Sequence, residues 1–264
     1  MRKALDKLSE ERDALSAYVE AHEALVSPIR RLPLDILEEI FMACLPDRNC
    51  VMSAQEAPVI LGRICSSWRT ISLSTPRLWS RLHIVEPMGY ISLNTSQRLQ
   101  RLEVAKSWLR RSGDCPLSIS LEGNPDAYIP PPSGTIVTSA EQDLFLDGLV
   151  QFASRWRNIR LVAPQLALAP LSRLTEQDVP LLEQLDIVCS TPEDPQHTSD
   201  AGWSLAQSGV FHGPSLSTFS ISGNTSKASE LPLRWNQLTT LSLFGALNSE
   251  LAPSSSRVLR REIR

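Results

Sequence analysis

One short apolar pattern recurs in the C-terminal half of this 264-residue chain and limits its fold more than any other feature. The copies are Leu182-x-x-Leu185-x-Ile187, Leu216-x-x-Phe219-x-Ile221, Leu238-x-x-Leu241-x-Leu243 and the looser Trp156-x-x-Ile159-x-Leu161. Alternate side chains of such a segment point to one side of a strand, and a unit this small buries that side only against its neighbours. The pattern therefore predicts parallel strands near residues 160, 186, 220 and 242, with helices on the other side of the stack.

The residues before these copies predict the same alternation of helix and strand. Thr95 is a good cap for a helix that runs to Arg111, and the alternating apolar residues from Leu117 to Leu121 predict a strand near residue 119. A second helix is expected from Ser139 to Arg155. Repeated helix and strand segments indicate an α/β fold.

The recurring pattern resembles the strand segment of leucine-rich repeats. The offsets between copies are irregular, and the asparagine that regular repeats place after the strand is missing as a rule. We therefore expect residues 85–264 to form an irregular, leucine-rich-repeat-like α/β solenoid that presents a curved surface to a protein target. The tail from Pro253 to Arg264 fits no repeat, which suggests either a truncated array or a frayed helix.

Three short helices are predicted between residues 28 and 82. Pro33 suits a first helical turn, and the residues after it place Ile36, Leu37, Ile40, Phe41 and Cys44 on one broad apolar face until Pro46 ends the helix. A second helix fits from about Pro58 through Ile71, and a short third segment after Pro76 carries Leu78, Trp79 and Leu82. A unit of this size is marginal alone and should lean on a neighbour.

These helices carry the ordered motifs Leu32-Pro33-x-Asp35-Ile36-Leu37-x-x-Ile40-Phe41, Ile64-Cys65-x-x-Trp68-Arg69 and Leu78-Trp79. The set resembles an F-box. The resemblance implies docking to the small adaptor of an SCF-type, cullin-based ubiquitin ligase. On this reading the adaptor-binding residues would be Leu32, Pro33, Leu37, Ile40, Leu45, Ile64 and Trp68.

The connection between the first two helices is longer than in a compact F-box, and the segment from Pro46 to Ala57 is interpreted as an inserted loop. This pattern is similar to F-box proteins common in mushroom-forming fungi, a similarity that extends to about residue 162. The predicted organisation is an N-terminal helix at residues 1–27, an all-helical F-box unit at 28–84 and the repeat region at 85–264.

The N-terminal helix carries a short heptad seam with apolar residues at Leu5, Leu8, Leu15, Val19 and Val26, interrupted by Arg12 and His22. One interpretation is a coiled coil that dimerises the protein. The other is a solvated helix that packs on, or precedes, the F-box unit.

Composition excludes several classes of function. The chain has 29 acidic and 26 basic residues and a net charge of −3, which gives no electrostatic footprint for nucleic acid. Its five cysteines are scattered without a CxxC pair, as expected in a reducing compartment.

The N-terminus is too charged for a signal peptide, and no apolar run reaches the ~18 residues of a membrane span. We expect a cytoplasmic or nuclear protein.

No catalytic constellation is found. The four histidines lie far apart, none in a metal-ligand spacing, and no phosphate-binding or nucleophile motif is present. The sequence therefore predicts no enzyme, no metal and no cofactor. The leading hypothesis is a substrate receptor of an SCF-type ligase. The alternative is a non-ligase, adaptor-binding scaffold that oligomerises through the N-terminal helix.

Overall fold

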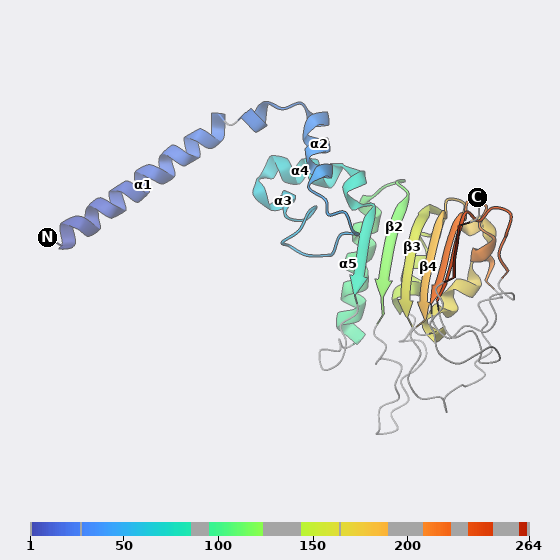
Figure 1. Ribbon diagram of the computed structural model, residues 1–264. Coiled ribbons are helices and arrows are strands. Elements are labelled where there is room, and N and C mark those ends of the chain that lie inside the picture. Colours follow the sequence, from blue (N-terminus) through green and yellow to red (C-terminus); the bar gives the residue numbers. More distant parts are fainter. Residues whose placement is uncertain are drawn as a thin grey trace, which may run out of the picture. The chain divides into compact units, whose positions relative to one another are not determined.

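The computed structural model describes residues 2–26, 28–85, 95–123, 144–163, 165–189, 208–222, 232–244 and 259–262. The chain forms two compact units, Met1–Ala43 and Cys44–Arg264 (Figure 1). The division falls within residues 28–84, where the sequence resembles an F-box. Residues 44–84 thus belong to the same compact unit as the sheet.

The first unit is helical. It contains α1 (Arg2–Val26), the 3-10 helix η1 (Pro28–Arg31) and α2 (Leu34–Ala43). The carbonyl of Pro33 accepts the first helical hydrogen bond, from the Leu37 N–H at 3.1 Å. Asp35 lies in the first turn of α2, where the helix dipole favours a negative charge. Helix α1 agrees with the sequence-based expectation, whereas α2 ends at Ala43, before Pro46, and leaves Cys44 exposed outside the helix.

The second unit is built on a seven-stranded sheet in which strand order follows chain order. The strands are β1 (Arg81–Val85), β2 (Leu117–Glu122), β3 (Trp156–Ala163), β4 (Gln184–Cys189), β5 (Thr218–Ser222), β6 (Thr240–Phe244) and β7 (Leu259–Glu262). The first six run parallel, and β7 pairs antiparallel with β6. The parallel strands expected near residues 119, 160, 186, 220 and 242 are confirmed; β1 and β7 were not anticipated.

Helices cover one face of this sheet (Figure 1). They are α5 (Thr95–Arg111), α7 (Leu144–Val150) and the 3-10 helices η5 (Ala153–Arg155), η6 (Gln165–Arg173), η7 (Glu176–Asp178) and η10 (Gly209–His212). The helix expected from Ser139 to Arg155 is shorter than predicted. Its part from 144 onward is α7 followed by η5, and residues 139–143 lie outside the described residues.

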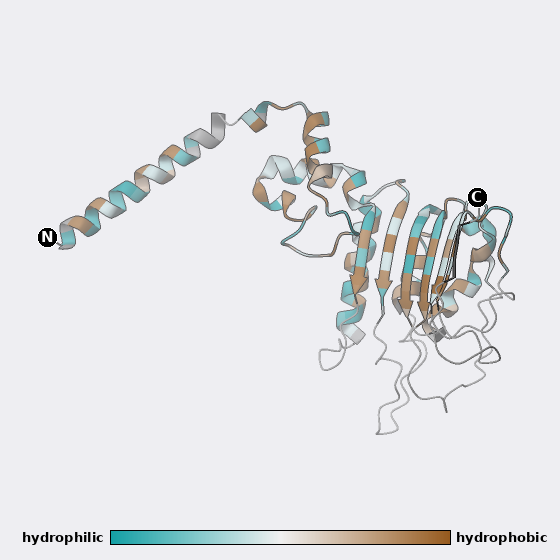
Figure 2. Cartoon of the chain, viewed as in Figure 1, coloured by the Kyte–Doolittle hydropathy of each residue, from teal (hydrophilic) through white to brown (hydrophobic). Residues whose placement is uncertain are grey.

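Strands β1 to β6 alternate between the helix-covered core and the opposite face of the sheet (Figure 2). Two rows of apolar side chains cross the sheet on the core side: Leu82, Ile119, Ile159, Leu185, Phe219 and Leu241, then Ile84, Leu121, Leu161, Ile187, Ile221 and Leu243. All are buried except the two from β6, which are half-buried. The LxxLxL pattern of the sequence therefore corresponds to these rows.

The helical part of the second unit differs from the expectation at two points. The second predicted helix is split into α3 (Leu61–Ile64) and α4 (Ser66–Ser74) because Cys65 between them is extended. Cys65 caps α4 by accepting the Trp68 N–H on its sulfur. The third predicted helix is only a 3-10 turn, η2 (Pro76–Trp79), and Leu82 belongs to β1 instead.

Trp79 joins these helices to the sheet layer. Its indole N–H donates to the Ser72 carbonyl of α4 at 2.7 Å, and its ring meets Trp108 of α5 edge to face at 4.8 Å. The Arg111 guanidinium lies 4.7 Å from the centre of the Trp79 ring. Trp79 thus has the core role that its sequence pattern favoured.

The segment from Pro46 to Ala57, which the sequence analysis interprets as an inserted loop, pairs with the first strand of the sheet. Its residue Val51 forms a parallel bridge with His83 of β1, and the His83 N–H donates to the Cys50 carbonyl at 2.7 Å. Cys50 is fully buried. The segment therefore lies along the outer edge of the sheet.

Candidate docking surfaces

An apolar stripe lies on the exposed side of α2. Pro33 and Ile36 are exposed, Ile40 is half-buried, and their spacing places them on neighbouring turns. Leu37 and Phe41 are buried, at 7% and 0% exposure. The single broad apolar face expected from the sequence is thus divided into a buried pair and an exposed stripe.

The seven residues expected to bind an adaptor differ in accessibility. Pro33 and Ile64 are exposed; Leu32, Ile40, Leu45 and Trp68 are half-buried; Leu37 is buried. The first unit holds Leu32, Pro33, Leu37 and Ile40, and the second holds Leu45, Ile64 and Trp68. Ile36 and Leu34, which were not among the seven, are 45% and 55% exposed, and Ile36 lies on the exposed stripe with Pro33. A helical wheel could not separate Ile36 from Leu37, since the two are neighbours on the same apolar face.

A second apolar surface belongs to α3 in the sheet-containing unit. Ile64 is 58% exposed, and Ile60, one turn earlier, is also exposed. Helix α4 is tied to α3, because the Arg69 side chain donates to the Gly62 carbonyl at 2.8 Å. Other described residues leave much of Ile64 and part of Ile60 uncovered.

The sheet face opposite the helices is polar along two of its three rows; the third row, Val85, Glu122, Val162, Val188, Ser222 and Phe244, is mostly apolar. Two rows of side chains cross it from β1 to β6: Arg81, Ser118, Asn158, Gln184, Thr218 and Thr240, then His83, Ser120, Arg160, Asp186, Ser220 and Ser242. Every position in the two rows can donate or accept a hydrogen bond. The part of the face that these two rows cover therefore suits contacts to another polar molecule better than packing against an apolar layer.

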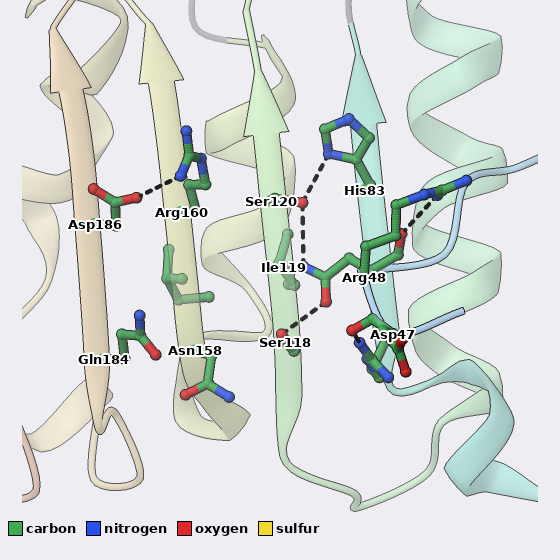
Figure 3. Close-up of a pocket in the computed structure, with 13 residues that line it drawn as sticks. Asp47, Arg48, His83, Ser118, Ile119, Ser120, Asn158, Arg160, Gln184 and Asp186 are labelled. Carbon is green, nitrogen blue, oxygen red and sulfur yellow. Dashed lines mark hydrogen bonds and ion pairs between the residues drawn. The ribbon is translucent and has the colours of Figure 1, made fainter. Parts of the chain in front are cut away.

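A hollow of about 480 Å³ lies on this face over β1–β4 (Figure 3). The segment from Asp47 to Asn49 forms one wall. The Asn49 side chain donates to Ser120 Oγ at 3.1 Å and accepts from the Ser118 hydroxyl at 2.9 Å. His83 Nδ1 lies 2.8 Å from the same Ser120 hydroxyl. This half of the hollow is a connected hydrogen-bond network.

The other half of the hollow keeps unused hydrogen-bonding groups. Arg160 of β3 pairs with Asp186 of β4 at 2.9 Å. Beside this pair, Asn158 and Gln184 are neighbours across the same two strands. Among the residues that the structure describes, neither side-chain amide has a hydrogen-bond partner. No other described side chain thus occupies these amides, and both line the hollow.

Comparisons with protein-family models, curated proteins and solved structures found no match. What these surfaces can bind is therefore inferred from their own side chains. In the part of the chain that the structure describes, no group of three or more His, Cys, Asp or Glu residues is placed to hold a metal ion. Within the same ranges, no helix combines the length and apolarity needed to cross a bilayer. The two kinds of surface offer apolar burial in one case and hydrogen bonds with charge in the other.

Proposed function

We propose that the chain is the substrate-recognition subunit of an SCF-type ubiquitin ligase. Residues 28–84 act as an F-box that binds the adaptor and, through it, cullin. Residues 85–264 act as an irregular leucine-rich-repeat-like solenoid that holds a protein target. The chain performs no chemistry of its own and works by raising the effective concentration of target lysines near the ubiquitin-charged enzyme. It would act in the cytoplasm or nucleus.

The observation that carries the adaptor part is the exposure of apolar side chains within the F-box-like motifs. Ile36 on the first unit and Ile64 on the second reach solvent, although isoleucine is usually buried or scattered singly on a surface, and Pro33 is exposed beside Ile36. The motif Leu78-Trp79 is buried and holds the helices to the sheet. The motifs thus supply both a core and a surface for docking.

The target part is supported by strand order and by the polar rows. Six parallel strands that follow chain order are what a stack of repeats produces. The opposite face carries two uninterrupted polar rows and the hollow beside Asn158 and Gln184. Such a face can hydrogen-bond the backbone and side chains of a bound protein segment.

Co-purification of the full chain with the adaptor and cullin tests the proposal. We expect the wild-type chain to recover both proteins. The double variant Leu32→Ala with Pro33→Ala and the single variant Ile64→Asp should each lose at least tenfold in adaptor affinity, which is the scale of a hot-spot residue. Arg160→Ala, on the polar sheet face, is the matched control and should bind the adaptor as the wild type does.

Failure of a folded wild-type chain to recover the adaptor would overturn the proposal. Unchanged binding by both surface variants would overturn the assignment of the docking residues. Recovery of the adaptor without cullin would favour the second candidate, a non-ligase scaffold. A separate observation, the exposed apolar side chains of α1, supports that candidate. Self-association through α1 would not depend on adaptor binding.

A further inference from the structure

Helix α1 exposes an apolar seam that other described residues leave uncovered. Leu5, Leu8, Leu15 and Val19 are between 46% and 65% exposed although they recur on one side of a 25-residue helix. Such a helix is about 37 Å long. The seam from Leu5 to Val19 covers about 21 Å of it, and an apolar seam on a solvated helix is a surface for another helix.

Charge along α1 is divided between its two halves. Residues 2–12 hold four basic and three acidic side chains, a net charge of +1, whereas residues 13–26 hold three acidic side chains and no lysine or arginine, a net charge of −3. Two copies side by side in the same direction would bring the −3 halves together. Two copies in opposite directions would bring each +1 half against a −3 half, which Coulomb attraction favours.

The polar residues in the seam point to the same orientation. In a parallel, in-register pair, Arg12 would meet Arg12 and His22 would meet His22 of the second copy. In the antiparallel pair, Arg12 lies opposite Leu15 and His22 opposite Leu5, with Leu8 opposite Val19. The methylene stem of an arginine packs well on leucine while its charged head stays in water. The antiparallel register therefore buries the seam without placing like charges in one layer.

We propose that α1 binds α1 of a second copy of this chain as an antiparallel two-helix coiled coil with Leu8 opposite Val19. The interaction makes the protein a dimer through a segment outside both the adaptor-docking and the target-binding surfaces. A dimer presents two target-binding faces, so a multivalent target gains avidity without new contacts.

Sedimentation of the full chain at concentrations up to about 100 µM tests dimerisation. The range extends this high because a helix pair with so short a seam should bind weakly. Leu8→Glu should raise the dimer dissociation constant at least tenfold. Ala17→Glu introduces the same charge on the side of α1 away from the seam and should leave the dissociation constant within about twofold. Both positions are exposed, so neither variant threatens the fold. A wild-type chain that stays monomeric throughout this range would overturn the proposal.

Cysteine cross-linking tests the orientation. Chains carrying Leu8→Cys and Val19→Cys, mixed and oxidised, should form the mixed disulfide, with oxidised wild-type chain as the baseline for the native cysteines. Each variant alone should not cross-link above that baseline, because eleven residues separate the two positions and identical cysteines would lie about 16 Å apart along the helix. Efficient self-cross-linking of Leu8→Cys would show a parallel pair and overturn the proposal.

Added salt should weaken the antiparallel dimer, because it screens the attraction between the oppositely charged halves of the two helices. A dimer that tightens with salt contradicts the proposal.

Discussion

Asn49 donates a hydrogen bond from its side-chain amide to the hydroxyl of Ser120, 71 residues later in the chain, at 3.1 Å. The oxygen of the same amide accepts from Ser118. One side chain thus holds the segment from Pro46 to Ala57 to β2, across β1. The segment closes the outer edge of the sheet, where unpaired N–H and C=O groups would otherwise invite pairing with another chain.

Asn49→Ala should release this segment. The loss of two hydrogen bonds at a half-buried site should lower the free energy of unfolding by about 1–3 kcal/mol. Cys50, the next residue, is buried, and burial raises the pKa of its thiol, so it should resist alkylation in the wild type. In Asn49→Ala, native-state alkylation of Cys50, followed by mass spectrometry, should become faster.

Asn158→Ala is the matched control for this change. Asn158 lies in the same hollow, but its amide has no hydrogen-bond partner among the described residues. Its replacement should leave the unfolding free energy within about 0.5 kcal/mol of wild type and Cys50 equally protected. Equal effects of the two substitutions would mean that Asn49 does not anchor the segment.

The sequence predicted the strands that carry the LxxLxL pattern because their packing requirement is local. Leu185 and Ile187, for example, alternate within one strand and must share a side of it. The polar rows follow from the same alternation once the register is known. Register itself is set by contacts between strands far apart in sequence, so the pairing of Asn158 with Gln184 could not be read from the chain.

The elements that the sequence did not predict depend on tertiary contacts. Leu82 and Ile84 alternate as a strand requires, but only two apolar residues signal β1, and the preceding Leu78 and Trp79 continued a helical spacing through Leu82. Strand β7 has no repeat pattern because it runs antiparallel. Cys65 breaks a sequence that is helical on both sides, and its sulfur then caps the next helix. Propensity alone does not predict such breaks.

Trp79→Phe should destabilise the chain more than Trp156→Phe. Both indoles are buried, but that of Trp79 donates to the Ser72 carbonyl, whereas that of Trp156 has no hydrogen-bond partner among the described residues. The first substitution leaves a buried carbonyl unsatisfied at a cost of about 1–3 kcal/mol; the second relieves an unsatisfied N–H. Because the volume lost is the same, chemical denaturation of both variants measures the hydrogen bond together with the contacts of the Trp79 ring to Trp108 and Arg111. A larger loss in Trp156→Phe would contradict this account.

Gly209→Ala should disturb the contact between η10 and the chain after η6. A methyl group there would lie 2.7 Å from the Leu174 carbonyl oxygen and 2.8 Å from the Thr175 Cα, both backbone atoms that cannot rotate away. We expect a loss of about 1–3 kcal/mol in thermal or denaturant unfolding. At Gly213, four residues later, the nearest atom would be 3.4 Å away, so Gly213→Ala is the control and should be tolerated. Equal losses at the two glycines would show that close approach is not the cause.

Stability should fall above pH 9 through Cys189. Burial raises the pKa of its thiol from 9.0 to about 11. Below pH 9 the thiol is neutral in both states; between pH 9 and pH 11 it ionises in the unfolded chain alone, which favours unfolding. The contribution lost by pH 11 is on the order of 2 kcal/mol. Denaturation of wild type and Cys189→Ala between pH 8 and pH 11 should show the steeper decline in wild type; parallel profiles would contradict the prediction.

Leu37→Ala and Ile36→Ala should separate folding from docking on α2. Leu37 is buried, so its truncation should lower the unfolding free energy by about 2–4 kcal/mol and reduce adaptor binding only as far as the chain unfolds. Ile36 is exposed, so its truncation should leave the unfolding curve nearly unchanged and weaken adaptor binding directly. Calorimetric titration with the adaptor, at a temperature where both variants remain folded, distinguishes the two effects. If Leu37→Ala then binds more weakly than Ile36→Ala, the adaptor contacts the pair that is buried in the free chain, and docking must involve a rearrangement of α2.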